Sequence, residues 1–149
     1  MVVPTNSDPA VHVVAFNLLC EDFIARGTYR DDFECRLNPA WVVKVEIDKG
    51  DWRSFMNVKE YHFWDWNKDY KKVSDWLAPC HFLSPDGRIL IQSKVKMAKE
   101  HDPLPEKIPA FFTDLKPQNF GWLGERFVCL DYATTLDNPN VRLKTADWH

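Results

Sequence analysis

A short polar segment near the end of the sequence contains residue types that could do chemistry. Residues 114–119 read Asp-Leu-Lys-Pro-Gln-Asn, and a further carboxylate, Asp131, follows twelve residues after Asn119. A carboxylate can accept a proton, an ammonium group can stabilise negative charge, and carboxylate or amide oxygens can hold a metal ion. The same segment could instead form a plain surface turn, because Asp, Pro and Asn favour turns. Asp131 could likewise only end a strand or lie in a solvated loop.

The spacing of this segment resembles the catalytic loop of protein kinases, which reads H-R-D-x-x-x-x-N. The form D-L-K-P-x-N is similar to that of serine/threonine kinases in particular. The resemblance implies that Asp114 accepts the proton of a substrate hydroxyl and that Lys116 contacts the transferring phosphate. It also implies that Asn119 and Asp131 hold Mg²⁺, with Val-Cys-Leu-Asp-Tyr-Ala at 128–133 in place of the strand that ends in D-F-G. ATP and Mg²⁺ are therefore the expected cofactors.

The resemblance also implies nucleotide-binding positions upstream of this loop. Lys44, in a Val-Val-Lys stretch, corresponds to the strand lysine of V-A-I-K, and Glu60 on the following helix corresponds to its partner. Gly27 stands where the family has a phosphate-covering loop with three glycines. Gln92 would guard the back of the adenine pocket, and the chain from there to Val95 would form the hinge.

Two of these residues have ordinary structural alternatives. Lys44 could be an exposed strand lysine that pairs with Glu46 or Glu34, and Glu60 could be a solvated helix residue. Neither residue type is informative by itself, so the resemblance depends on the order of all five elements, which spans about residues 24–135.

The sequence departs from the family in two ways. Phe112 and Thr113 stand where kinases have the His and Arg that precede the catalytic Asp, and the missing Arg argues against control by activation-loop phosphorylation. Only 18 residues follow Asp131, so we do not expect the activation segment, the A-P-E motif or the helices that hold a peptide substrate. We therefore expect a kinase-like nucleotide site without the usual platform for a peptide.

Two functions remain open at this point. The first is a minimal phosphotransferase that acts on a protein; the chain is similar in style to small kinase-like proteins of bacterial viruses, for which the target would be a host protein. The second is an inactive, pseudokinase-like protein that binds a host partner and modulates it. An exposed aromatic face left by the missing lobe would favour a complex or a homodimer.

The elements that must position these residues predict an α+β fold. We expect one domain over residues 1–149, with a kinase-like N-lobe part at 10–95, a hinge at about 92–95 and a much reduced C-lobe at 96–149. The N-lobe part would hold an antiparallel sheet and one main helix. Three prolines exclude a long helix from 96 to 112. The expected strands are 32–37, 41–47, 78–83, 88–95, 120–123 and 126–131. The expected helices are 70–77 and 52–66, the latter capped by Asp51 or Ser54. Residues 10–25 fit either a buried helix or a strand followed by a turn.

Composition narrows the class of protein further. A net charge of -3 without a long basic block argues against nucleic-acid binding, and the short basic run at 94–99 fits a solvated strand edge. The four cysteines are scattered, and three of them stand among apolar neighbours, which predicts buried, reduced thiols. The five histidines show no metal-binding spacing. No apolar run is long enough to cross a membrane, and the start lacks the features of a signal peptide, so we expect a cytoplasmic protein.

Overall fold

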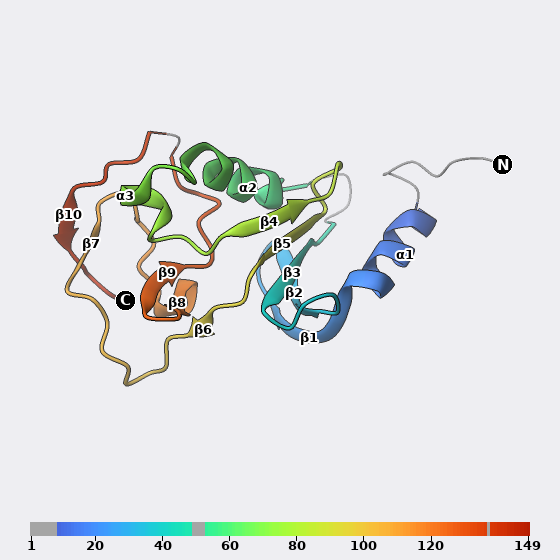
Figure 1. Ribbon diagram of the computed structural model, residues 1–149, viewed down its shortest axis with the longest axis horizontal. Helices are drawn as coiled ribbons and strands as arrows, with labels where there is room; N and C mark the ends of the chain where they lie inside the picture. Colours follow the sequence, from blue (N-terminus) through green and yellow to red (C-terminus); the bar gives the residue numbers. More distant parts are fainter. Residues whose placement is uncertain (1–8, 49–52, 137) are drawn as a thin grey trace. The chain divides into compact units, whose positions relative to one another are not determined.

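The computed structural model describes residues 9–48, 53–136 and 138–149 (Figure 1). The protein has an α+β fold whose sheets are built from antiparallel strand pairs. The chain divides into two compact units. The first unit comprises Met1–Val58 and Cys80–Ser93, and the second comprises Lys59–Pro79 and Lys94–His149.

The first unit contains a five-stranded antiparallel sheet in the order β1-β2-β3-β5-β4. Its strands form because short runs of β-branched and apolar residues alternate with turns. Five buried side chains make its core, namely Cys20, Cys35, Val43, Ile89 and Ile91. The elements of this unit are helix α1 (Pro9–Leu19) and strands β1 (Cys20–Arg26), β2 (Arg30–Cys35), β3 (Trp41–Glu46), β4 (Cys80–Leu83) and β5 (Ile89–Ser93).

A hairpin around Asp86 joins β4 and β5, where strands were expected at 78–83 and 88–95. The amide of Gly87 donates to the carbonyl oxygen of Ser84 at 2.8 Å, and Gly87 has a φ of 76°. One carboxylate oxygen of Asp86 accepts hydrogen bonds from the Ser84 hydroxyl and the Arg88 amide. A positive φ suits glycine, which explains why this residue stands in the turn.

The apolar stretch at 10–25, for which the sequence left two interpretations open, forms a helix and then a strand. Helix α1 ends at Leu19, and β1 continues directly from Cys20. Cys20 lies opposite Cys35 in the β1–β2 ladder, so the chain pairs with β2 from the first residue after the helix. Local apolar periodicity could not reveal this tertiary constraint.

Helix α2 (Met56–Asn67) starts later than the predicted residue 52. The Ser54 hydroxyl accepts a hydrogen bond from the Met56 amide at 3.4 Å, and Phe55 has a φ of 55°, so the helix cannot extend back through it. The other predicted cap, Asp51, lies outside the described residues. The helix crosses the division of the chain, because its residues from Lys59 onward belong to the second unit.

The second unit contains two small antiparallel sheets, one in the order β6-β8-β9 and one that pairs β7 with β10. Aromatic rings fill its core, where Phe120 and Phe127 stack at 5.4 Å and Phe112 contacts Phe120 edge-on at 5.3 Å. Its further elements are α3 (Lys71–Ser74), β6 (Lys96–Met97), β7 (Lys107–Pro109), the 3-10 helix η1 (Pro117–Asn119), β8 (Phe120–Leu123), β9 (Arg126–Cys129) and β10 (Leu143–Thr145).

Several sequence predictions are confirmed in this unit, and the three short strands β6, β7 and β10 were missed. The hairpin at 120–131 forms, and residues 96–112 contain no helix. The helix predicted at 70–77 shrinks to Lys71–Ser74, and strand β10 was not predicted because three residues carry too little pattern. In the two units together, all four cysteines are buried and none forms a disulfide bond, as predicted. Across the part of the chain that the structure describes, no helix is long and apolar enough to cross a membrane.

Candidate functional site

The segment at 114–119 forms a single turn of 3-10 helix that leads into β8. Helix η1 begins at Pro117, whose ring fixes the backbone angle that the first helical position needs. The Asn119 amide donates to the carbonyl oxygen of Lys116 at 2.9 Å and closes the turn. The backbone of residues 114–119 therefore forms a turn, which is one of the two interpretations that the sequence allowed. This turn brings the polar side chains of the segment together.

The carboxylate of Asp114 has partners on both of its oxygens. Its Oδ2 accepts a hydrogen bond from Asn119 Nδ2 at 3.3 Å and lies 3.8 Å from Lys116 Nζ. Its Oδ1 lies 3.5 Å from Nε2 of His149. The Asp114 side chain is 47% exposed, so a substrate could still reach it. Three residues that the sequence singled out as a group therefore lie together.

Asp131 follows the strand that returns to this turn. The amide of Leu130 donates to the carbonyl oxygen of Asn119 at 2.8 Å, which ties the end of the β8–β9 hairpin to η1. Asp131 is the next residue, it is exposed, and its own carbonyl oxygen accepts a hydrogen bond from Cys129 Sγ at 3.2 Å. Within the second unit, the hairpin therefore brings the backbone at Asp131 back to that of Asn119.

Behind Asp131, Tyr132 is locked into the core of the second unit. Its side chain is 1% exposed, its hydroxyl donates to the carbonyl oxygen of Ala78 at 2.8 Å, and its ring lies 5.9 Å from that of Phe63. Its amide donates to Oε1 of Glu60 at 2.7 Å, and Glu60 is fully buried. The alternative that Glu60 is a solvated helix residue is therefore wrong, because its carboxylate accepts a main-chain hydrogen bond in the interior.

The nucleotide-binding candidates of the first unit are largely buried. Lys44 on β3 is 2% exposed, so the alternative of an exposed strand lysine is wrong. Gln92 on β5 is fully buried, and its Nε2 lies 3.9 Å from Cys80 Sγ. Gly27 lies in the β1–β2 turn, where its amide donates to the carbonyl oxygen of Arg30 at 2.8 Å.

The remaining candidates belong to the second unit. Val95 is half-buried, and its Cγ1 would lie 2.6 Å from a Cβ placed at Gly121. The division of the chain falls between Ser93 and Lys94, so Val95 and Gln92 belong to different units. Lys44 belongs to the first unit and Glu60 to the second, so the pairing of these two residues stays a prediction.

Sequence reasoning missed two residues that contact the loop. Lys144 donates from Nζ to the carbonyl oxygen of Phe112 at 2.7 Å, and His149 lies beside Asp114. Both come from the end of the chain, about 30 residues away in sequence, and neither stands in a motif. The pairing of β10 with β7, which no local pattern reveals, brings this end of the chain toward the loop.

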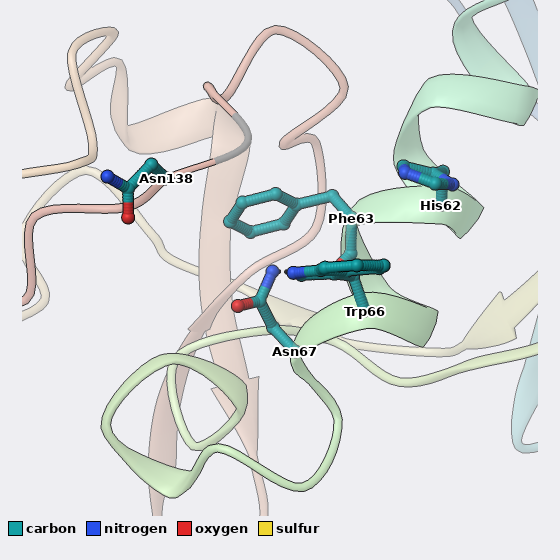
Figure 2. Close-up of a pocket in the computed structure, with 5 residues that line it drawn as sticks. All are labelled: His62, Phe63, Trp66, Asn67 and Asn138. Carbon is teal, nitrogen blue, oxygen red and sulfur yellow. Dashed lines mark hydrogen bonds between the residues drawn. The ribbon is translucent and has the colours of Figure 1, made fainter.

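A separate pocket of about 350 Å³ lies beside helix α2 in the second unit, and its lining includes none of the predicted site residues. Figure 2 shows Phe63 extending from α2 toward the segment that carries Asn138. Asn67 Nδ2 donates to the carbonyl oxygen of Phe63, and the ring of His62 stacks on that of Trp66 at 6.1 Å. These contacts lie within one helix, so they do not identify a ligand.

Acidic, thiol and imidazole side chains are the usual metal ligands of proteins. Among the described residues, no group of three or more His, Cys, Asp or Glu side chains is arranged to hold a metal ion. No protein-family model matches the chain, and no curated protein matches its sequence.

Proposed function

We propose that this chain is a kinase-like protein that binds ATP with Mg²⁺ and transfers phosphate to a hydroxyl group of a protein. The observation that carries the proposal is the gathering of Asp114, Lys116 and Asn119 in one turn, at the base of the hairpin that ends next to Asp131. A base, a cation and oxygen ligands within one small region are what phosphoryl transfer needs, because its catalysis is mostly positioning and electrostatics.

The oxygen atoms of this region suit magnesium. Mg²⁺ prefers hard oxygen ligands and is commonly held by one or two protein groups together with substrate phosphates. Asn119 donates from its amide nitrogen to Asp114, which leaves its amide oxygen as an acceptor for the ion. The exposed carboxylate of Asp131 would supply the second protein ligand. Bound Mg²⁺ would neutralise the charge that develops on the phosphates.

The other residues have distinct proposed roles. Asp114 would accept the proton of the attacking hydroxyl, and Lys116 would stabilise the transferring phosphate. Lys44 would contact the nucleotide phosphates with Glu60 as its partner, because a buried ammonium group needs compensating charge. Gly27 would approach the phosphates, and Gln92 and Val95 would line the adenine pocket.

Thermal unfolding with and without nucleotide tests the binding step. Millimolar ATP with Mg²⁺ should raise the melting temperature by several degrees, because a ligand at about 100 times its Kd stabilises the folded state by about 2.7 kcal/mol. Asp131→Ala should remove the magnesium-dependent part of the shift. Glu125→Ala, an exposed carboxylate at the other end of the same hairpin, is the matched control and should keep it. The absence of any shift in the unaltered protein would refute nucleotide binding.

Transfer of radiolabelled γ-phosphate to protein tests the chemical step separately. Asp114→Ala should retain the ATP-dependent thermal shift and lose transfer, because the proposed base contacts the acceptor and not the nucleotide. Binding without transfer in the unaltered protein would favour the second function below.

The second candidate function is a pseudokinase-like protein that binds and modulates another protein. Two large apolar side chains of the second unit favour it, since Trp66 is 75% exposed and Leu136 is 81% exposed. Exposed apolar side chains of this size are common where proteins associate. Sedimentation across a range of concentrations would reveal a homodimer, which Trp66→Ser should weaken if the partner is a second copy.

A further inference from the structure

The last residues of the described chain return to the candidate loop and contact it at three points. Lys144 Nζ donates to the carbonyl oxygen of Phe112 at 2.7 Å. The His149 amide donates to the carbonyl oxygen of Leu115 at 3.2 Å, and its imidazole Nε2 lies 3.5 Å from Asp114 Oδ1. Two contacts hold the main chain on either side of Asp114, and the third holds its carboxylate.

The course of this segment is set by contacts other than those with the loop. Strand β10 pairs with β7, as Figure 1 shows, with Lys144 opposite Ile108. The Ala146 amide then donates to the carbonyl oxygen of Glu106 at 2.8 Å. Because main-chain pairing anchors the segment, the loop contacts follow from the fold and do not depend on one exposed ion pair.

Trp148 fixes the final turn of the segment. Its indole Nε1 donates to the carbonyl oxygen of Pro105 at 3.0 Å. Its ring contacts Phe120 edge-on at 5.1 Å and Phe127 at 5.7 Å, so it packs on the aromatic core that carries β8 and β9. A tryptophan held by a hydrogen bond and two ring contacts is a strong anchor, which places the neighbouring His149 at the loop.

The loop itself has few means of fixing Asp114. Its only helical element is the three-residue η1, and the side chains of Phe112 and Thr113 carry no charge. Within the loop only one oxygen of the carboxylate is contacted, by Asn119 and Lys116. A carboxylate that is held at only one oxygen can rotate about the Cβ–Cγ bond of its aspartate, because this χ2 torsion has a broad range of favoured angles. A contact at the second oxygen restricts the rotation.

We propose that Leu143–His149 is a positioning segment for the candidate catalytic loop. Lys144 holds the main chain at Phe112, and His149 orients the carboxylate of Asp114 from the side opposite Asn119. Lys144 and His149 act through the loop, so they are positioning residues. The consequence for phosphate transfer rests on the proposed function, whereas the restraint on the loop does not.

Amide hydrogen exchange of the full-length protein tests the restraint without nucleotide. The reporters are the amides of Asn119 and Leu130, whose hydrogen bonds close the loop and tie it to the hairpin. Lys144→Met should speed their exchange about tenfold, because one hydrogen bond that stabilises the closed loop is lost. The matched control is Lys107→Met, which removes an exposed bond to Thr145 in the same small sheet and should leave both rates unchanged.

The contact between His149 and Asp114 has a spectroscopic signature of its own. Asp114→Asn should move the ring resonances of His149 and leave those of His81, which belongs to the first unit, unchanged. His149→Gln, which retains an N–H donor, should keep the Asn119 exchange rate within about twofold of the original, and His149→Ala should raise it severalfold.

These outcomes separate this inference from the proposed function. Unchanged exchange in both Lys144→Met and His149→Ala, with melting temperatures within a degree or two of the original, would overturn the positioning role. Faster exchange in a protein that shows no ATP-dependent thermal shift would support the positioning role and refute the proposed function. If transfer occurs, His149→Ala should lower kcat severalfold with little change in the KM for ATP; an effect on that KM alone would count against the role.

Discussion

Replacement of Glu60 tests the buried contact that ties helix α2 to the segment after β9. Its fully buried carboxylate accepts the Tyr132 amide at 2.7 Å. Glu60→Ala leaves that amide without this acceptor, which costs about 2 kcal/mol because a buried donor loses its hydrogen bond. It also removes one buried methylene group, worth about 0.8 kcal/mol. We expect a total loss of about 3 kcal/mol in the free energy of unfolding, a large part of what an ordinary domain possesses.

A graded series of substitutions distinguishes the hydrogen bond from general disruption. Glu60→Gln keeps an oxygen and nearly the same volume, so it should cost about 1 kcal/mol, less than half of the Glu60→Ala value. Glu125→Ala, an exposed residue, should change stability by less than about 0.5 kcal/mol.

Urea unfolding followed by tryptophan fluorescence measures these free energies, since the protein contains seven Trp. Two results would refute the reasoning. A cost below 1 kcal/mol for Glu60→Ala would mean that the amide of Tyr132 does not depend on this carboxylate. Equal costs for the Gln and Ala variants would mean that charge, and not the acceptor oxygen, is what the site requires.

Three further predictions concern packing and titration. Gly121→Ala should destabilise the protein by about 2–3 kcal/mol, because the new Cβ would lie 2.9 Å from the backbone carbonyl carbon of Lys96. An unchanged melting temperature would contradict this close approach of the two backbone segments. Burial lowers the pKa of His81 below the ordinary 6.5, so its contribution to stability is present above pH 6.5 and is lost as the pH falls through the lowered pKa. An NMR titration should give a midpoint below 6.5 that rises in Trp41→Ala, which removes the ring stacked on His81 at 4.9 Å; a midpoint at or above 6.5 would exclude the effect. Burial raises the pKa of the Cys20 thiol from 9.0 to about 11, so the free energy of unfolding should fall as the pH rises from about 9 through 11. The Cys20→Ala variant should show a shallower fall. Parallel curves of stability against pH for the two proteins would argue against a raised pKa at Cys20.

The sequence predicted best the structural features that are determined by residues close to one another in the chain. The hairpin at Asp86-Gly87 follows from turn chemistry, and β3 follows from its β-branched residues. The grouping of Asp114 with Asn119 belongs to the same class, because a proline-initiated turn brings residues five positions apart together. In each case the information lies within a few residues.

The sequence could not predict contacts that depend on distant partners. Helix α1 gives way to a strand where Cys20 pairs with Cys35 of β2. The buried carboxylate of Glu60 accepts a hydrogen bond from Tyr132, which lies 72 residues further along the chain. His149 was missed because β10 has only three residues and its partner strand is equally short. Such short strands gain their stability from tertiary packing, which leaves almost no local pattern in the sequence.

The polar group around Asp114 contributes little to the stability of the fold. Its side-chain contacts are 3.3–3.8 Å long and about half-exposed, and exposed ion pairs contribute at most about 1 kcal/mol. The aromatic core and the buried contacts of Tyr132 and Glu60 account for the packing of the second unit without it. A surface turn made for stability alone has no need of a carboxylate held at both oxygens. Folding therefore gains little from ordering three polar side chains at one exposed point, whereas the proposed phosphate transfer would require that order.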